Sequence, residues 1–414
     1  MMKLSSLIKI RLAFLGFSSG INYATIGASF TLFLNDFEVA YALIGFFSLR
    51  LMPYSFKAFW APIIELLPIK LISKRYAPVI SRLIVCQITI ICGYLLVASY
   101  ANPTFHLKLL LGLSIFIAII ASIYDISLHQ FRIKTLEKEK YTNAIVSFSF
   151  NSGFITSLSC GLLLSQYVSW SIIYIGYALF LIPGLIMLLC TYNLTENHFI
   201  IPVEESLIRV RKRYFIPFIS LFRKKNIWAV IIIAIFFKAS DAFMNNLLMP
   251  YLLKVGFSKQ DILTNNKLLE YVSHSLGLYA FIRISASSIN KIRFLITAEI
   301  FAACSNLAFI VFSYYPNTTL LTVISFTEGA ISSLCNALML FFLTSFAKNS
   351  RAFATSFYIF LESLALLGRT IIASFAGVAV ESFGWQGYLV LSTLLSIPTI
   401  FACYYLSKNK PGFI

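Results

Sequence analysis

The sequence predicts an all-α membrane protein in which twelve transmembrane helices form two six-helix bundles, with the N and C termini in the cytoplasm. Three observations predict this class: an apolar composition, apolar stretches of membrane-spanning length, and alternating basic and non-basic loops. Of the 414 residues, 59% are hydrophobic and only 12% are charged. Soluble domains carry about 25% charged residues. The chain therefore has too little polar surface for a water-soluble fold, and lipid is the solvent that fits.

Twelve apolar stretches are each long enough to cross a bilayer. A transmembrane helix needs about 20 mostly apolar residues to cross about 30 Å of hydrocarbon. In the first half of the chain, the expected spans are 12–34, 39–62, 79–100, 107–128, 142–164 and 170–191. In the second half, they are 227–250, 262–282, 292–313, 319–342, 352–379 and 385–406.

The connections between these spans sort into two sets by charge. One set, which includes both termini and every second loop, contains most of the 33 Lys and Arg residues. The opposite set holds only Lys108, Lys254 and Lys259. Cytoplasmic loops carry an excess of Lys and Arg, so the basic set is predicted to face the cytoplasm. The alternation supports the count of twelve, because losing one span would place basic loops on both sides.

The longest polar segment, 192–226, is predicted to be a basic cytoplasmic linker or a helix on the membrane surface. It separates an N-terminal bundle, 1–191, from a C-terminal bundle, 227–414. The apolar run that begins at Leu12 is too long for the hydrophobic region of a signal peptide, which is about 7–15 residues. It is therefore expected to be the first span.

Several functional classes are disfavoured by the sequence. The net charge of +17 does not predict a nucleic-acid partner, because the basic residues are confined to short segments between apolar stretches. The seven cysteines lie within apolar stretches and form no C-x-x-C pair, so neither a metal site nor a disulfide is predicted. Gly-rich phosphate loops and H-E-x-x-H are absent from the sequence. We therefore expect no enzymatic activity and no cofactor.

Ionisable residues inside the predicted spans are the candidates for function. Each charged group at the bilayer centre costs about 2.5–3.5 kcal/mol on insertion scales, so each calls for an explanation. The candidates are Arg50, Lys57, Glu65 and Asp125 in the first half, and Lys238, Asp241, Lys267, Glu270, Glu299, Glu328, Glu362 and Arg369 in the second.

Three pairs of these residues have helical spacing. Lys238 and Asp241 are three residues apart, as are Lys267 and Glu270, whereas Glu362 and Arg369 are seven residues apart on one stripe. Residues three or four apart are neighbours on a helix. Each pair can either stabilise the bundle as an ion pair or line a water-filled cavity that binds solute or carries protons.

Glu328 has no nearby cation in the sequence, since the nearest Lys or Arg is Lys348. Burial without a cation favours the protonated carboxyl group, and a carboxyl group that loses and regains a proton suits a proton-coupled carrier. We therefore interpret Glu328 as the first candidate for proton coupling, with Asp241 and Glu362 as further candidates. The alternative is a neutral, hydrogen-bonded acid that packs between helices.

Asp125 lies near the cytoplasmic end of the fourth predicted span, seven residues before Arg132. An ion pair at a gate and a role in binding both remain open. The adjacent His129 is expected to pack or to form hydrogen bonds.

Short stretches recur along the chain in an order and spacing typical of one transporter family. In the first half they are LGFSSG at 15–20, IGFFSL at 44–49, PYSFKAFWAP at 53–62 and Asp125-Ile126. In the second half they are KASDAF at 238–243, Asn266-Lys267, Ser305-Asn306, Glu328, Gly368-Arg369 and ESFGW at 381–385. Together they resemble the AmpG-type muropeptide permeases of the major facilitator superfamily over nearly the whole chain.

The resemblance implies a multi-pass symporter of the bacterial inner membrane. It would import anhydro-muropeptides, GlcNAc-anhydroMurNAc with a peptide stem, for peptidoglycan recycling, driven by protons and working by alternating access of two bundles. The residues carried over as cavity residues are Lys57, Asp125, Lys238, Asp241, Lys267, Glu328 and Arg369. Cations would meet the carboxylates of the solute, and carboxylates would meet its amine.

The sequence departs from the family pattern at three places. His129 stands where the family usually has a second acid, Asn151 stands where it usually has an arginine, and the loop motif after the second span is eroded at 61–66. Asn151 is kept as a candidate solute-binding residue. The departures leave open a carrier for another polar metabolite, such as an acetyl-CoA-like solute, or a diverged sensor or scaffold that transports nothing. The expected partners are a small muropeptide-like solute, protons and the lipid bilayer; no obligate protein partner is inferred.

Overall fold

The computed structural model describes residues 2–57, 60, 64, 78–135, 142–190, 222, 226–285, 291–348 and 354–409. Every regular element in these ranges is a helix. Within them, seven helical segments are long and apolar enough to cross a membrane. A helix satisfies its backbone hydrogen bonds internally, as the bilayer interior requires. The predicted all-α membrane fold is confirmed, whereas the count of twelve spans and the location of the termini remain predictions.

The chain forms two compact units. The first comprises Met1–Val39 and Arg50–Leu207, and the second comprises Ala40–Leu49 and Ile208–Ile414. The boundaries predicted from the sequence, at 191 and 227, fall near the division at 207. The predicted linker lies almost entirely outside the described residues, so its structure and these boundaries remain predictions.

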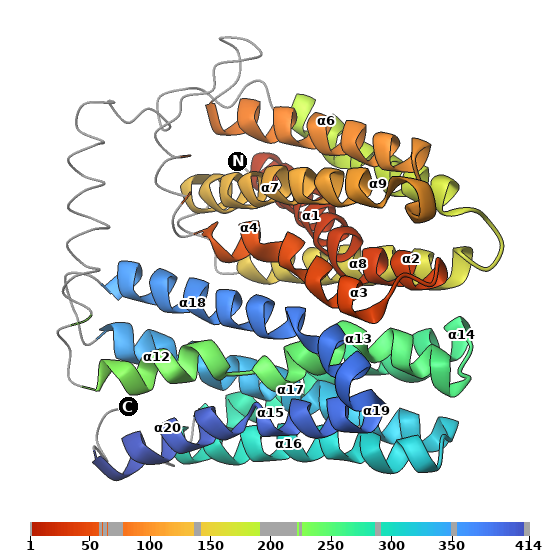
Figure 1. The fold of residues 1–414 in the computed structure, drawn as a ribbon. Coiled ribbons are helices and arrows are strands. Elements are labelled where there is room, and N and C mark those ends of the chain that lie inside the picture. Colours follow the sequence, from red (N-terminus) through yellow and green to blue (C-terminus); the bar gives the residue numbers. More distant parts are fainter. Residues whose placement is uncertain are drawn as a thin grey trace. The chain divides into compact units, whose positions relative to one another are not determined.

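The first unit is a bundle in which α1 packs along α8, and α6 packs against α7 and α9 (Figure 1). Its elements are α1 (Met2–Ala24), a π-helical turn (Thr25–Ser29), α2 (Phe30–Asp36), part of a 3-10 turn (Ser48–Leu51), α4 (Met52–Ser55), α6 (Pro78–Ser99), α7 (Pro103–Thr135), α8 (Thr142–Leu164) and α9 (Trp170–Leu189).

Two glycines allow α1 and α8 to approach closely. A Cβ atom at Gly20 would lie 1.9 Å from the carbonyl oxygen of Phe150, and one at Gly153 would lie 2.1 Å from that of Phe17. Small residues at such positions let backbones meet, and van der Waals packing is what drives helix association in lipid. The two glycines therefore fix α8 against α1.

The second unit is a larger bundle in which α15 packs along α17, α16 packs against α17, α19 and α20, and α12 packs against α18 and α20 (Figure 1). Its elements are α3 (Tyr41–Phe47), α12 (Ile227–Phe236), α13 (Ala239–Val255), α14 (Lys259–Ile262), a π-helical turn (Leu263–Lys267), α15 (Leu268–Ser285), α16 (Lys291–Tyr314), α17 (Thr318–Lys348), α18 (Ala354–Ser374), α19 (Ala376–Leu394) and α20 (Ile397–Asn409).

The short helix α3 packs on α19 within this second unit. The Ala42 N–H donates a hydrogen bond of 2.8 Å to Glu381 Oε1, and the rings of Tyr41 and Trp385 meet edge to face at 5.2 Å. A Cβ atom at Gly45 would lie 2.7 Å from the backbone nitrogen of Gly377, so this contact also depends on glycine.

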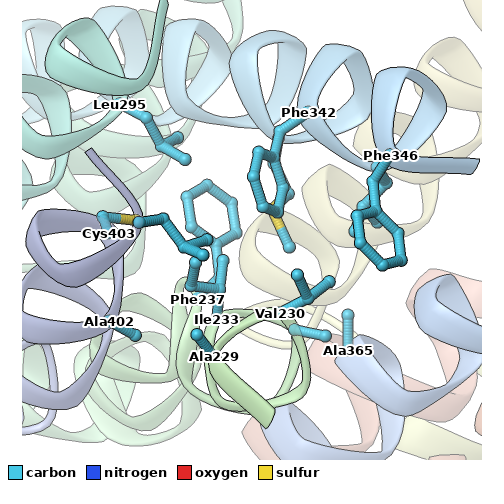
Figure 2. Close-up of a cluster of buried hydrophobic side chains, with 14 of the residues drawn as sticks. Ala229, Val230, Ile233, Phe237, Leu295, Phe342, Phe346, Ala365, Ala402 and Cys403 are labelled. Atoms are coloured by element: carbon cyan, nitrogen blue, oxygen red, sulfur yellow. The ribbon is translucent and has the colours of Figure 1, made fainter. Parts of the chain in front are cut away.

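One end of the second unit is filled by an apolar cluster to which α12, α16, α17, α18 and α20 contribute (Figure 2). Members include Val230 and Ile233 of α12, Leu295 of α16 and Phe342 of α17. Phe237, directly after α12, is 2% exposed and lies in the same cluster. This packing fixes α12 at its C-terminal end, next to the interruption described below.

Two predicted spans of the second half differ from the observed helices. The expected spans 352–379 and 385–406 appear as three helices, α18, α19 and α20. Gly384, at the expected connection, has φ +68° and a non-helical backbone, and two helical segments of α19 meet there at a kink. Pro398 lies at the start of α20, where its missing N–H is tolerated, and it separates α20 from α19. The expected connection next to Gly384 therefore coincides with a break in the helix, whereas the division between α19 and α20 was not expected from the sequence.

Candidate functional site

In the first unit, the candidate residues Lys57 and Asp125 lie together. Lys57 follows α4, and Asp125 lies on α7 with 12% of its side chain exposed. The Lys57 ammonium forms an ion pair with Asp125 Oδ2, and the Ser19 hydroxyl of α1 donates a hydrogen bond of 2.8 Å to Asp125 Oδ1. The Lys57 ammonium also lies 4.7 Å from the centre of the Tyr54 ring, a cation–π distance. Helix α1, helix α7 and the segment after α4 thus together position the Lys57 cation and the Asp125 anion.

The remaining candidates of the first unit include Asn151, His129, Arg132 and Glu65. Asn151 is exposed on α8, and its role in solute binding remains a prediction. The side chains of Arg132 and His129 lie outside the described residues, so the open Asp125–Arg132 pairing also remains a prediction. Glu65 lies outside the described residues as well.

Arg50 stabilises an interruption in the first span. The π-helical turn Thr25–Ser29 contains a non-helical residue, Gly27, and a π-helical turn of this kind interrupts the regular ladder of backbone hydrogen bonds. The Arg50 guanidinium, only 2% exposed, donates hydrogen bonds to the carbonyl oxygens of Ile26 and Gly27, the latter at 2.7 Å. It also donates to Thr31 Oγ1 at 3.2 Å. The planar group reaches several acceptors at once, which a lysine ammonium does not match.

In the second unit, the seventh predicted span is interrupted at Lys238. Between α12 and α13, Lys238 adopts a left-handed conformation with φ +55°, which is uncommon for a residue other than glycine. Its ammonium lies 3.4 Å from Asp241 Oδ2 and 2.5 Å from the hydroxyl oxygen of Ser332 on α17. The pairing of Lys238 with Asp241 expected from their spacing is present.

Lys267, Glu270 and Glu328 are connected by an asparagine. The Lys267 ammonium lies 2.9 Å from Glu270 Oε2, as the spacing predicts, and 3.4 Å from Asn245 Oδ1. The Asn245 amide nitrogen donates a hydrogen bond of 3.2 Å to Glu328 Oε1. Glu328 is 3% exposed, and its second oxygen has no hydrogen-bond partner among the described residues. Although no cation is near Glu328 in the sequence, the fold brings Lys267 to it through Asn245.

A glycine permits this arrangement. A Cβ atom at Gly329 would lie 2.5 Å from the carbonyl oxygen of Glu270. The neighbouring Glu328 of α17 is therefore held close to the start of α15, which contains Glu270 and follows directly on Lys267. Close approach of the two backbones is thus what builds the network.

The remaining candidates lie on α18. Arg369 donates a hydrogen bond of 3.2 Å from Nε to the carbonyl oxygen of Ala365, and Glu362 is half-buried. The expected pairing of Glu362 with Arg369 and the roles of both in transport remain predictions.

Sequence reasoning missed the neutral members of these networks. Ser19, Asn245 and Ser332 each touch a predicted charged residue, yet a neutral polar residue in a span attracts less notice than a charge. Asn245 had one recognisable feature: it lies four residues after Asp241, so the two share a helix face. Ser19 belongs to the LGFSSG stretch that was singled out for its family resemblance.

Each unit therefore holds buried or half-buried charges of both signs. Buried charges in membrane proteins face protein interiors or water-filled cavities and pair with one another. Such groups can bind the opposite charges of a zwitterionic solute, and carboxyl groups among them can bind protons.

Comparison with known proteins identifies the family. The model of the major facilitator superfamily matches residues 12–367. A Rickettsia bellii protein named "Putative transporter AmpG 1" is 25% identical over 408 residues, covering 95% of this chain and 97% of that protein. The anhydromuropeptide permease of Escherichia coli K12 is 24% identical over 397 residues, covering 94% of this chain and 77% of the permease.

Solved structures share the fold at lower identity. The nucleoside transporter NupG matches with a TM-score of 0.72 and 15% identity, covering 97% of this chain and 99% of that one. A D-xylose-proton symporter matches with a TM-score of 0.70 and 11% identity, covering 98% of both chains. Because the family model covers most of the sequence, this chain belongs to the major facilitator superfamily and is a membrane transporter of that type.

Proposed function

We propose that this transporter is a proton-coupled importer of anhydro-muropeptides in a bacterial inner membrane, working by alternating access. The observation that carries the proposal is the network of Lys267, Glu270, Asn245 and Glu328, which joins a cation, its paired acid and a second buried acid. The names of the relatives, AmpG transporters and an anhydromuropeptide permease, support the same solute class.

The charges suit a solute that carries both carboxylates and an amine. Lys238 and Lys267 are each paired with an acid three residues later. A solute carboxylate can replace Asp241 or Glu270 as the partner of these ammonium groups, because it forms the same strong, charge-assisted hydrogen bond. The freed acid can then receive the solute's amine. The peptide stem of a muropeptide supplies both kinds of group.

Glu328 is the proton-coupling residue in this proposal. One oxygen accepts a hydrogen bond from neutral Asn245, and the other has no partner in the described part of the chain. Burying an unpaired carboxylate is expensive, so such a group neutralises by binding a proton. A proton taken up at Glu328 from one side and lost to the other would couple the gradient to transport. Asp241 and Glu362 remain secondary candidates.

The proposal is tested by uptake of labelled GlcNAc-anhydroMurNAc-peptide into liposomes containing the purified protein. An imposed inward proton gradient should drive accumulation, and a protonophore should abolish it. Protein-free liposomes of the same lipid composition provide the background.

Competition separates the solute classes. Unlabelled muropeptide should inhibit uptake, whereas acetyl-CoA should not. Inhibition by acetyl-CoA alone would move the assignment to that class of metabolite. If folded protein accumulates no muropeptide under any gradient, the proposed function is wrong.

A further inference from the structure

The interruption of the seventh span needs a group to hold it in place. A left-handed conformation costs roughly 1–2 kcal/mol for a residue other than glycine, so Lys238 keeps φ +55° only because its surroundings favour it. The interruption also leaves the first N–H groups of α13 without partners in their own helix. Partners outside the helix are therefore needed at this point.

Glu299 of α16 provides one such partner. Its Oε1 accepts a long hydrogen bond of 3.4 Å from the Lys238 N–H. Glu299 is 1% exposed, and its Oε2 atom has no hydrogen-bond partner within the described ranges. A carboxyl group suits this position because the N-terminus of a helix carries partial positive charge. Buried acids are costly, so an acid retained here calls for a specific explanation.

Helix α16 holds the chain at two points, just before the interruption and at the interruption itself. Leu295 precedes Glu299 by four residues, so the two lie on one face of α16. Leu295 belongs to the apolar cluster that holds Phe237 (Figure 2). Glu299 accepts a hydrogen bond from the backbone N–H of Lys238. The chain is thus fixed before the interruption by apolar packing and at the interruption by Glu299.

We propose that Glu299 is a positioning residue for solute binding. By holding the Lys238 backbone, it sets where the Lys238 ammonium lies relative to Asp241 and Ser332. Nothing in this assignment requires Glu299 to touch the solute. The inference rests on the proposed function to the extent that Lys238 is taken there as a solute-binding group.

Three variants isolate this role. Glu299→Leu removes the hydrogen-bond acceptor while filling most of the volume. Glu299→Gln keeps a carbonyl acceptor of the same reach. Asn306→Leu is the matched control, because Asn306 is also fully buried on α16, seven residues further along the same stripe, and its side chain has no hydrogen-bond partner in the described structure.

The primary measurement is amide hydrogen exchange of the segment 236–241 in the full-length protein in detergent or nanodiscs. The exchange rate reports how firmly the Lys238 N–H is hydrogen-bonded, and the measurement needs no solute. Glu299→Leu should speed exchange in this segment by about tenfold or more, the change that about 1.4 kcal/mol produces. Glu299→Gln and Asn306→Leu should leave it close to wild type.

The second measurement is muropeptide uptake against solute concentration. Glu299→Leu should raise the concentration for half-maximal uptake by about tenfold, the same factor for the same loss of about 1.4 kcal/mol, and Glu299→Gln should restore it. A purely structural residue would lower the amount of folded protein without this shift in concentration dependence.

The outcomes distinguish the two proposals. Unchanged exchange in Glu299→Leu overturns the positioning role, as does an equal effect of Asn306→Leu. Faster exchange in Glu299→Leu, with no muropeptide uptake by the wild-type protein, supports the hold of Glu299 on Lys238 and rejects the proposed solute.

Discussion

At the scale of single residues, the candidate site depends on charged groups held by neutral ones. Asp125 binds both the Lys57 ammonium and the Ser19 hydroxyl, and Asn245 links Glu328 to Lys267. Neutral polar partners of this kind fix the geometry of a charge without cancelling it. The charged residues could be listed from the sequence, because any charge in an apolar stretch is conspicuous. Their partners on other helices could not, since those contacts depend on which helices meet.

The Lys57–Asp125 pair predicts a non-additive effect on stability. Asp125→Asn leaves the half-buried Lys57 ammonium without its anion and should destabilise the protein by about 1.5–3 kcal/mol, the usual range for hydrogen bonds to charged groups. Lys57→Gln combined with Asp125→Asn should destabilise it less than either single change, because no unpaired charge remains. The apparent melting temperature in detergent measures this. Strictly additive losses would contradict the pairing.

Arg50 predicts a failure of a conservative substitution. Arg50→Lys keeps the charge but loses the planar group that donates to Ile26, Gly27 and Thr31. We expect the melting temperature in detergent to fall by several degrees, because carbonyl oxygens at the π-helical turn lose donors worth about 1 kcal/mol each.

The matched control for Arg50→Lys is Arg283→Lys in α15, because Arg283 is exposed. Substitutions at exposed positions usually change the free energy of unfolding by no more than about 0.5 kcal/mol, so this variant should melt close to wild type. Equal stability of Arg50→Lys and wild type would show that charge alone suffices at the π-helical turn.

At the scale of helices, the regular helices could be predicted from the sequence, whereas the interruptions within them could not. The predicted span 142–164 coincides with α8, and 292–313 differs from α16 by one residue at each end. Continuous apolar runs with no competing structure make such helices predictable. The interruption at Lys238 was missed because neither proline nor glycine marks it. It depends on tertiary partners, among them Glu299 and Ser332.

Close helix contacts in each unit depend on glycine. Gly329→Ala places a methyl group 2.5 Å from the Glu270 carbonyl oxygen and should separate α17 from α15. We expect a loss of about 1–3 kcal/mol, typical of overpacking, together with loss of transport, because Glu328 would move away from Asn245. The melting temperature in detergent and muropeptide uptake measure the two effects.

The matched control for this change is Gly176→Ala in α9, where no atom lies within 4 Å of the added methyl group. It should leave transport unchanged and should not lower the melting temperature, because Ala is more favourable than Gly inside a helix by up to about 1 kcal/mol. If Gly329→Ala behaves like Gly176→Ala, the backbones of α15 and α17 do not need this close approach.

At the scale of the whole molecule, the fold class followed from composition and hydropathy, and the family followed from short stretches spread along the chain. Both depend on many residues at once, so an error in placing a few residues does not change the predicted fold class or family. The solute and the coupling ion depend on a few side chains in a network. The sequence could name the charged members, such as Lys267 and Glu328, but not the contacts that join them.

The central claim is that Glu328 couples a proton gradient to solute movement. The direct test compares Glu328→Gln with wild-type protein in two assays on the same liposomes: gradient-driven uptake of labelled anhydro-muropeptide, and exchange of labelled for unlabelled solute without a gradient. We expect Glu328→Gln to lower gradient-driven uptake by about tenfold or more, equivalent to about 1.4 kcal/mol, while exchange continues. Gradient-driven uptake at the wild-type rate in Glu328→Gln would contradict the account.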